Sequence, residues 1–331
     1  MRPGWGPAAV LVGAAAWGST GTAAHFAPPG ATASSIGAAR IAVGGLGLLI
    51  VAVSTAASRD AVARMLSVGG VPRAGDAGDQ EGPGGRPAGR RAGSWLAVIV
   101  LAAAAVAGYQ VCFFTAVRAT GVAIGTVVAI GSAPGWTGLL TLLTGGPRPG
   151  RRWLLATVAA VAGCVVLVTG GRASGVSPAG VALALAAGLC YAVYAVAAAR
   201  MITTGNAESA VMGLIFGGAA VLLAPVLAAS DTGWLLTIRG LAVVGYLGVV
   251  TTVVAYLLYG RGLRTVPVPT ATTLGLAEPA VAAVLGLIVL HERLSAAAIA
   301  GLVLIGLALA TVAAAPAAAR AEGIERAGPP G

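Results

Sequence analysis

Ten long apolar runs, separated by shorter polar segments, follow one another along the chain. Each run has roughly the 17 to 25 residues that a helix needs to cross the hydrocarbon core of a bilayer. The strands of a membrane β-barrel would instead be alternating segments of about 10 residues. The pattern therefore predicts an all-α integral membrane protein with ten transmembrane helices. The runs are residues 7–25, 36–56, 95–117, 121–143, 153–170, 178–199, 209–229, 240–260, 266–290 and 295–315.

A proline interrupts the fourth run of each half of the chain, at Pro134 and at Pro279, about 145 residues apart. A proline inside a helix removes one backbone hydrogen bond and clashes with the carbonyl group four residues earlier. We therefore expect helix breaks at both prolines, and we expect Pro279 to leave the carbonyl of Gly275 without its usual donor. Paired runs interrupted at corresponding positions are typical of carriers built from two repeats. The halves also match ahead of these runs, where Tyr109 and Arg118 correspond to Tyr256 and Arg264.

Composition supports the membrane location and limits the chemistry. The chain is 58% hydrophobic and only 9% charged, with a mean hydropathy of +0.93, whereas a soluble domain is about 25% charged. The net charge of +10 comes from arginine alone, because the chain has no lysine. A Walker A loop requires a lysine, so the sequence excludes this nucleotide site, and it offers no other cofactor site.

The positions of the arginines predict the orientation in the membrane. If the amino terminus is cytoplasmic, fifteen of the twenty arginines fall in cytoplasmic segments and four in outer loops. Arginine and lysine are enriched in cytoplasmic loops, so we expect a plasma (inner) membrane protein with both termini cytoplasmic. This location makes membrane lipid the expected partner of the basic segments, and not nucleic acid.

Five spans in each half, an odd number, invert the second half relative to the first. We therefore expect a first five-helix repeat over residues 1–172 and a second over 173–315. Residues 57–94 are rich in glycine, proline and arginine without apolar periodicity, which predicts a disordered cytoplasmic linker inside the first repeat. Residues 316–331 are expected to be a cytoplasmic tail.

Only two ionised side chains lie within the ten runs, Arg40 and Glu278. A charge at membrane depth is costly and indicates a functional site. Arg40 is one to two turns from the outer end of its run, so extension of its head group to the interface is an alternative to ligand binding. Glu278 lies near the middle of its run, so its shorter side chain cannot extend to the interface in this way. We predict that Glu278 couples transport to a proton or orients a substrate; a structural carboxylate held by a neighbouring hydroxyl is the alternative.

Aromatic and amide side chains within the runs are further candidates for lining a substrate path. A hydroxyl or amide group in hydrocarbon needs a hydrogen-bonding partner, so these groups should face the interior of the bundle. For the tryptophans, simple helix packing is an equal alternative. Trp234 differs because it precedes its run, where indole rings anchor at the lipid head groups. The candidates are Trp17, Tyr109, Gln110, Trp136, Tyr194 and Tyr256.

These residues also carry a family resemblance. The stretch LAEPAVAAVLGLIVLHERLS, with Glu278-Pro279 followed by His291-Glu292-Arg293, resembles the EamA-type carriers of the drug/metabolite transporter superfamily, as do AAAWGST and AARIAVGGL in the first two runs. The resemblance covers nearly the whole chain apart from residues 57–94 and the tail. It implies two inverted five-helix repeats that move small organic molecules through a central cavity by alternating access.

The first repeat departs from that pattern. Ala133 stands where Glu278 stands in the second repeat, so the second half alone would supply a central acid. Trp136 corresponds to Val281, and we expect it to close the opposite wall of the cavity.

The combined interpretation is a secondary transporter of small metabolites, amino acids or drugs that works without a cofactor. Export is favoured by the resemblance, and coupling to protons and a homodimer remain open. An enzyme would need clustered acids, histidines or metal ligands at membrane depth, and the runs offer one acid. A membrane scaffold that does not transport and a flippase of lipid-linked molecules are the remaining alternatives.

Overall fold

The computed structural model describes residues 5–67, 95–169, 177–291 and 293–327, without the side chains of residues 122, 123 and 315–327. Every regular element in these ranges is helical. Nine helical stretches within them are long and apolar enough to cross a membrane, in agreement with an all-α membrane protein. They are α3 (Ala33–Ser54), α5 (Trp95–Thr120), α6 (Val122–Leu143), α7 (Arg151–Thr169), α8 (Pro178–Thr203), α9 (Glu208–Ala228), the continuous run of α10 (Ile238–Gly248), η4 (Val249–Val254) and α11 (Ala255–Leu263), the pair α12 (Val268–Leu274) and α13 (Ala277–Val289), and α14 (Ala296–Ala327).

The first predicted run, residues 7–25, forms two short helices in place of one. They are α1 (Trp5–Gly18), with 14 residues, and α2 (Thr20–His25), with 6. Ser19 lies between them, and its hydroxyl donates a hydrogen bond to the carbonyl of Ala16 at 2.7 Å. Serine side chains that bond nearby backbone compete with regular helical bonding, which explains the interruption here.

The two prolines act differently from the prediction. The expected break at Pro134 is wrong, because α6 continues through it as one helix. The carbonyl that Pro134 leaves without its helical donor is that of Ile130, four residues earlier, and the surrounding protein allows membrane helices to tolerate such a proline. In the second half the break precedes Pro279, because α12 ends at Leu274 and α13 begins at Ala277.

The carbonyl of Gly275 is also not left without a donor. It accepts a hydrogen bond from the backbone N–H of Glu278 at 3.0 Å. This bond spans three residues instead of four, as in a 3₁₀ turn. The tighter turn therefore replaces the bond that proline cannot make.

Two helices extend into segments that the sequence assigned to the linker and the tail. α4 (Ala56–Leu66) occupies the start of the predicted linker, and the side chain of Thr55 caps it by accepting the N–H of Ser58 at 3.2 Å. Ala61 and Met65 of α4 are buried, so this part of the linker is a packed helix. The rest of the linker, residues 68–94, lies outside the described residues. At the other end, α14 continues past the predicted boundary at 315 to Ala327.

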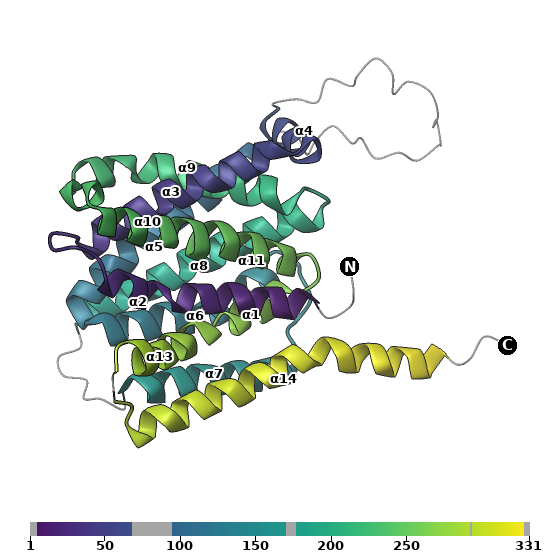
Figure 1. Ribbon diagram of the computed structural model, residues 1–331. Coiled ribbons are helices and arrows are strands. Elements are labelled where there is room, and N and C mark those ends of the chain that lie inside the picture. Colours follow the sequence, from purple (N-terminus) through teal and green to yellow (C-terminus); the bar gives the residue numbers. More distant parts are fainter. Residues whose placement is uncertain (1–4, 68–94, 170–176, 292, 328–331) are drawn as a thin grey trace, which may run out of the picture.

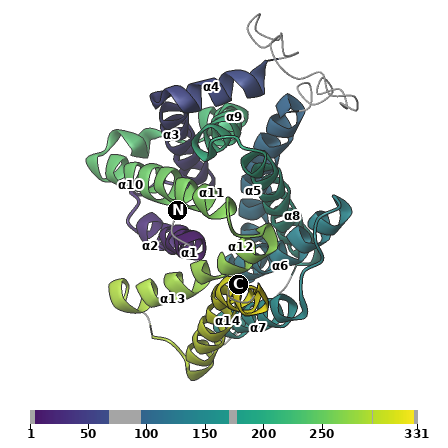
Figure 2. The ribbon, with the colours of Figure 1, turned by 90° about the vertical axis from the view of Figure 1, so that its right-hand side faces the viewer.

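The helices form one bundle in which most of them run along the same axis (Figure 1). Viewed along that axis, α3 and α9 lie side by side at one edge, and α7 and α14 lie at the opposite edge (Figure 2). Between these two pairs, α5, α6 and α8 pack together on one side of the bundle. α1 packs against α11 and α13 on the other side. The start of α1 and the end of α14 lie at the same end of the bundle (Figure 1).

The contact between α3 and α9 depends on glycine. A Cβ atom on Gly45 of α3 would lie 2.5 Å from the carbonyl oxygen of Phe216 and 3.0 Å from the Cβ of Ala220. A Cβ atom on Gly213 of α9 would lie 2.8 Å from the carbonyl oxygen of Leu48 and 2.6 Å from the Cβ of Ala52. Small residues that allow helix backbones to approach closely are typical of membrane helix interfaces.

A π-helical stretch, η4, joins α10 to α11. The hydroxyl groups of Thr251 and Thr252 both donate to the carbonyl of Leu247, at 2.7 and 3.0 Å. α5, which the sequence pairs with this helix, is a regular α-helix from end to end. The two halves therefore differ in this helix.

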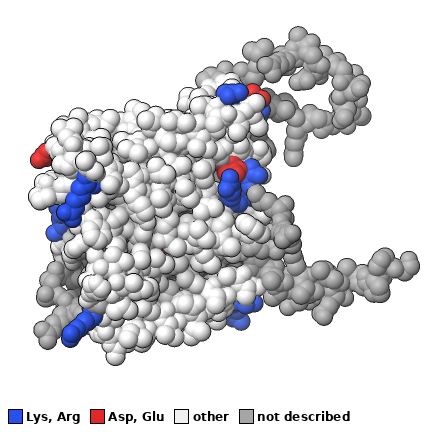
Figure 3. Space-filling view, in the orientation of Figure 1, with Lys and Arg blue, Asp and Glu red and all other residues white. Residues whose placement is uncertain are grey.

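Charged side chains on the visible face gather at the two ends of the bundle. Figure 3 shows arginines at opposite edges, with a broad uncharged band between them. Large apolar side chains such as Val100, Leu155, Val221 and Leu307 are more than half exposed. An apolar belt between two charged rims is what a bilayer-spanning protein requires.

Candidate functional site

A cavity of about 420 Å³ lies inside the bundle. Its walls come from α1, α2, α3, α5, α6, α8, α11 and the α12–α13 pair, so both halves of the chain contribute. Gly21 and Ala33 line it and are exposed, so the cavity reaches the surface at the end where α2 ends and α3 begins. At the opposite end, Tyr259, Leu263 and Met212 are almost completely buried. The cavity therefore opens toward one end of the bundle only.

Aromatic rings form much of the cavity wall. The ring of Tyr191 lies 5.1 Å from that of Tyr194 and 6.4 Å from that of Tyr109, and Trp17 lies 5.0 Å from Tyr256 (centroid distances). Tyr109 also stacks on Phe113, at 5.4 Å and 7° between planes. Helical spacing of three or four residues places each intrahelical pair on one face. The wall is therefore well suited to an apolar or aromatic part of a ligand.

The closed end of the cavity retains a hydrogen-bonding group that is unpaired within the described residues. The indole nitrogen of Trp17 is buried and has no hydrogen-bond partner among these residues, and Trp17 lines the cavity. Buried polar groups are normally paired. This group can therefore bind a polar ligand atom that reaches this depth.

Two charges of opposite sign face the cavity, Arg40 from α3 and Glu278 from the first turn of α13. Among the described residues, no salt bridge or hydrogen bond joins them to each other, and the Nε atom of Arg40 is buried without a hydrogen-bond partner. A charge in apolar surroundings is costly unless it is paired and hydrogen-bonded. The cavity thus presents one cationic and one anionic group that are not in direct contact with each other.

The position of Glu278 follows from the helix break and from close packing. α12 is tied to the first half by hydroxyl pairs, Thr272 with Thr137 at 2.8 Å and Thr273 with Thr157 at 2.9 Å. After the break, α13 passes so close to α1 that a Cβ atom on Gly18 would lie 2.7 Å from the carbonyl oxygen of Glu278. The start of α13 is therefore fixed between the two halves.

Gln110 has a structural contact as well as a position on the wall. Its Nε2 atom donates to the carbonyl of Gly37 at 3.2 Å, and the side chain is buried. A Cβ atom on Gly37 would collide with the ring of Phe114, so this ring of α5 packs directly against the backbone of α3. Gln110 therefore links these two helices beside the cavity.

The structure brings together most of the residues that the sequence singled out. Trp136 is the exception: it is half-buried on α6 and does not line the cavity. Sequence reasoning left Tyr191, Phe113 and Phe114 out of the site. The spacing of Tyr191 from Tyr194 by three residues, and of Phe113 from Tyr109 by four, could have indicated these two. The predicted residues that line the cavity are Trp17, Arg40, Tyr109, Gln110, Tyr194, Tyr256, Glu278 and Pro279.

Within the described ranges, no three histidine, cysteine or acidic side chains lie together in a way that could hold a metal ion. Glu292, which belongs to the motif quoted above, lies outside the described residues. The lining of the described cavity offers charged groups, hydrogen-bonding groups and aromatic surface.

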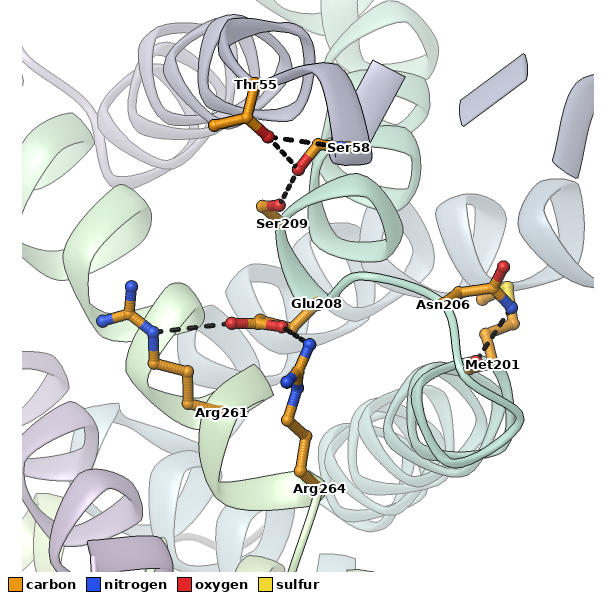
Figure 4. A network of polar contacts seen from close by, with 8 residues as sticks. All are labelled: Thr55, Ser58, Met201, Asn206, Glu208, Ser209, Arg261 and Arg264. Carbon is orange, nitrogen blue, oxygen red and sulfur yellow. Dashed lines mark hydrogen bonds and ion pairs between the residues drawn. The ribbon is translucent and has the colours of Figure 1, made fainter. Parts of the chain in front are cut away.

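The closed end carries a second polar cluster (Figure 4). Glu208, the first residue of α9, forms ion pairs with Arg261, at 3.5 Å, and with Arg264, both at the end of α11. The next residue, Ser209, shares a hydrogen bond of 2.8 Å with Ser58 of α4. This cluster joins three helices at the end opposite the mouth of the cavity.

Comparison with known proteins gives three findings. The model of the EamA-like transporter family matches residues 178–314. Over 307 residues, 93% of each chain, the protein is 37% identical to "Uncharacterized transporter YwfM" of Bacillus subtilis (strain 168). A solved crystal structure with 21% sequence identity has a TM-score of 0.70 and covers 92% of this chain and 96% of that one. The last likeness concerns the fold alone.

Proposed function

The chain belongs to the EamA-type transporters of the drug/metabolite transporter superfamily, and we propose that it is a secondary exporter of small organic molecules that works by alternating access. The cavity carries this proposal. It has room for a small molecule, it opens to one end, and its walls come from both halves of the chain. Binding sites of carriers lie between repeats in this way. The cavity also offers binding groups in place of clustered catalytic groups, which favours a carrier over an enzyme.

Helix contacts support ten crossings arranged as two inverted repeats, with α1 and α2 together as the first crossing. Each crossing of the first half can be matched with one of the second half, in the order in which they occur: α1–α2 with α8, α3 with α9, α5 with α10–α11, α6 with α12–α13, and α7 with α14. When every helix is replaced by its match, each of the contacts below becomes another observed contact or stays the same. The pairs α3 with α9 and α7 with α14 map onto themselves, and the pair α5 with α8 maps onto α11 with α1. A two-fold relation between the halves predicts this set of contacts.

Arg40 and Glu278 suggest the kind of molecule that is carried. Because both face the cavity and form no salt bridge with each other among the described residues, a substrate with an anionic and a cationic group could pair with both, while the aromatic wall receives its apolar part. Amino acids and related metabolites or drugs have this character. Glu278 can instead bind a proton when the substrate leaves. This exchange would couple the entry of a proton to the export of a substrate.

The arginine distribution supports an inner-membrane location with the closed end and both termini in the cytoplasm. In this orientation the described cavity faces outward. Membrane lipid surrounds the apolar belt, and the proposal requires no nucleic acid partner and no homodimer.

A transport assay tests the proposal. The purified protein in liposomes should move a substrate found by thermal-shift screening without ATP, and an inward proton gradient should accelerate export. Glu278→Gln removes the charge and keeps the size, so it should insert normally but lose the response to the gradient. Asp60→Asn, which removes an exposed acid of α4 that does not line the cavity, is the control for the loss of one carboxylate. Flux that requires ATP, or wild-type gradient dependence in Glu278→Gln, would contradict the proposed mechanism.

A further inference from the structure

We infer that Glu208, Arg261 and Arg264 form a latch that holds the closed end shut, and that the mirror position of the latch acid, at the open end, is Arg40. The inference rests on the proposed alternating access, because a latch has a role only if the two ends open in turn. It concerns which conformation the empty protein prefers, and not which substrate it binds.

The packing of α3 on α9 defines which residues correspond. Gly45 of α3 approaches Phe216 of α9 by its backbone, and Gly213 of α9 approaches Leu48 of α3 in the same way. A shift of 168 positions along the chain exchanges these contacts, since it maps Gly45 onto Gly213 and Leu48 onto Phe216. The correspondence is therefore set by contacts and not by sequence similarity.

A second pair of contacts obeys the same exchange. The Cβ of Ala220 is the side-chain neighbour of Gly45, and the Cβ of Ala52 is that of Gly213; these two alanines are again 168 positions apart. The same shift carries Arg40 onto Glu208. An arginine at the open end thus occupies the position that an acid occupies at the closed end.

The helix that packs beside Glu208, α11, also corresponds to a helix in contact with α3, which is α5, and each carries an arginine in its last turn. Arg264 stands at the end of α11, and Arg118 stands in the last turn of α5. At the closed end, Arg264 meets Glu208, and opposite charges attract. If α5 closed over α3 at the other end as α11 now closes over α9, Arg118 would approach Arg40, and like charges would repel. The two ends therefore differ in the sign of the interaction that closes them.

The latch is well placed to act on the motion of α11. Glu208 has a side chain only 14% exposed, and it lies at the start of a helix, where an acid is favoured, while the arginines lie at the end of another, where cations are favoured. A Cβ atom on Gly260 would lie 3.2 Å from the Cβ of Glu208, so the two backbones are close.

The base of the latch is fixed independently of α11. Asn206 donates to the carbonyl of Met201 at 2.9 Å, which closes the turn between α8 and α9 (Figure 4). Ser209 is bound to Ser58, whose hydroxyl accepts from Thr55 at 2.9 Å. Release of the ion pairs would therefore free the end of α11 and leave Glu208 in place.

Thiol accessibility without substrate tests the inference. In a background with Cys112, Cys164 and Cys190 replaced by alanine, Met212→Cys reports the closed end, because Met212 is fully buried beneath α11. Ala33→Cys reports the cavity mouth, where it is exposed. An impermeant thiol reagent is applied to inside-out vesicles for the first reporter and to intact cells for the second.

Glu208→Gln should raise the labelling rate at position 212 and lower it at position 33, by about three- to tenfold, the range expected for two partly exposed ion pairs. Arg40→Glu should act in the same direction, because it places an acid opposite Arg118 and creates the mirror latch. Asp60→Asn, which removes an exposed acid of α4 that forms no ion pair within the described residues, should leave both rates unchanged.

If Glu208→Gln does not insert, the pair Arg261→Gln with Arg264→Gln removes the same attraction from the other side. Unchanged labelling at both positions in the latch variants and in Arg40→Glu would overturn the inference. Because no substrate is present, this outcome would leave the transport proposal untouched. A protein that fails to transport could still show the labelling shift.

Discussion

The glycine contact between α3 and α9 allows a prediction whose size follows from the structure. In Gly213→Ala the new Cβ would lie 2.6 Å from the Cβ of Ala52 and 2.8 Å from the carbonyl oxygen of Leu48. A backbone carbonyl cannot rotate away as a side chain can, so the helices must separate. Overpacking of this kind costs about 1 to 3 kcal/mol. Alanine recovers about 1 kcal/mol through its higher helix propensity, so we expect a net loss of up to about 2 kcal/mol.

The matched control is Gly245→Ala on α10, where a Cβ atom would have no neighbour within 4 Å. This variant keeps the propensity gain without the collision, so it should be as stable as the wild type or up to about 1 kcal/mol more stable. The two alanine variants should therefore differ by about 1 to 3 kcal/mol, although the substitution is the same.

Unfolding in mixed micelles with increasing sodium dodecyl sulfate, followed by circular dichroism, measures the difference. Gly45→Ala, which meets the carbonyl of Phe216 at 2.5 Å, should behave like Gly213→Ala. If both variants unfolded at the same detergent fraction as Gly245→Ala, α3 and α9 would not be in the close contact described above, and the correspondence drawn from that contact would fail with it.

Three further predictions concern the site, the halves and the orientation. Arg40→Gln should weaken the binding of anionic or zwitterionic ligands by about tenfold or more, as expected for the loss of a hydrogen bond to a charged group, while Arg118→Gln should not; equal thermal shifts in the two variants would exclude a binding role for Arg40. In a double-mutant cycle, Thr137→Val and Thr272→Val should show a coupling of about 0.6 to 1.7 kcal/mol, and additive effects would mean that this hydroxyl pair does not connect the halves. A cysteine at Gly233 should react with an impermeant reagent in whole cells and one at Gly150 should not, and the reverse pattern would invert the proposed orientation.

The sequence was most informative where a polar group had to lie at membrane depth. Arg40, Glu278 and the tyrosines drew attention because hydrocarbon penalises unpaired polar groups, and that penalty does not depend on the fold. Trp136 was misplaced for a different reason. α6 lines the cavity through Thr126 and Ile130, and neither Trp136 nor Val281, with which the sequence paired it, is among the lining residues.

Contacts between segments that are far apart in the chain could not be predicted from the sequence. The prediction that Trp234 anchors at the lipid head groups is wrong, because its ring is buried and its indole N–H donates to the hydroxyl of Ser35 at 3.1 Å. The cluster of Glu208 with Arg261 and Arg264 was also missed. Its members are some fifty residues apart, and each taken alone is an ordinary charge at the end of a helix.

The π-helical stretch η4 sets the rotational phase of everything that follows it on α11. A π-helical turn contains one residue more than an α-helical turn, and each residue of an α-helix advances the side-chain direction by about 100°. Tyr256 at the cavity and Arg261 and Arg264 at the latch lie on the same helix beyond this stretch. Deletion of one residue within Val249–Val254 would therefore turn the cavity wall and the latch together by about 100°. The one extra residue in η4 therefore directs Tyr256 toward the cavity and Arg261 and Arg264 toward Glu208.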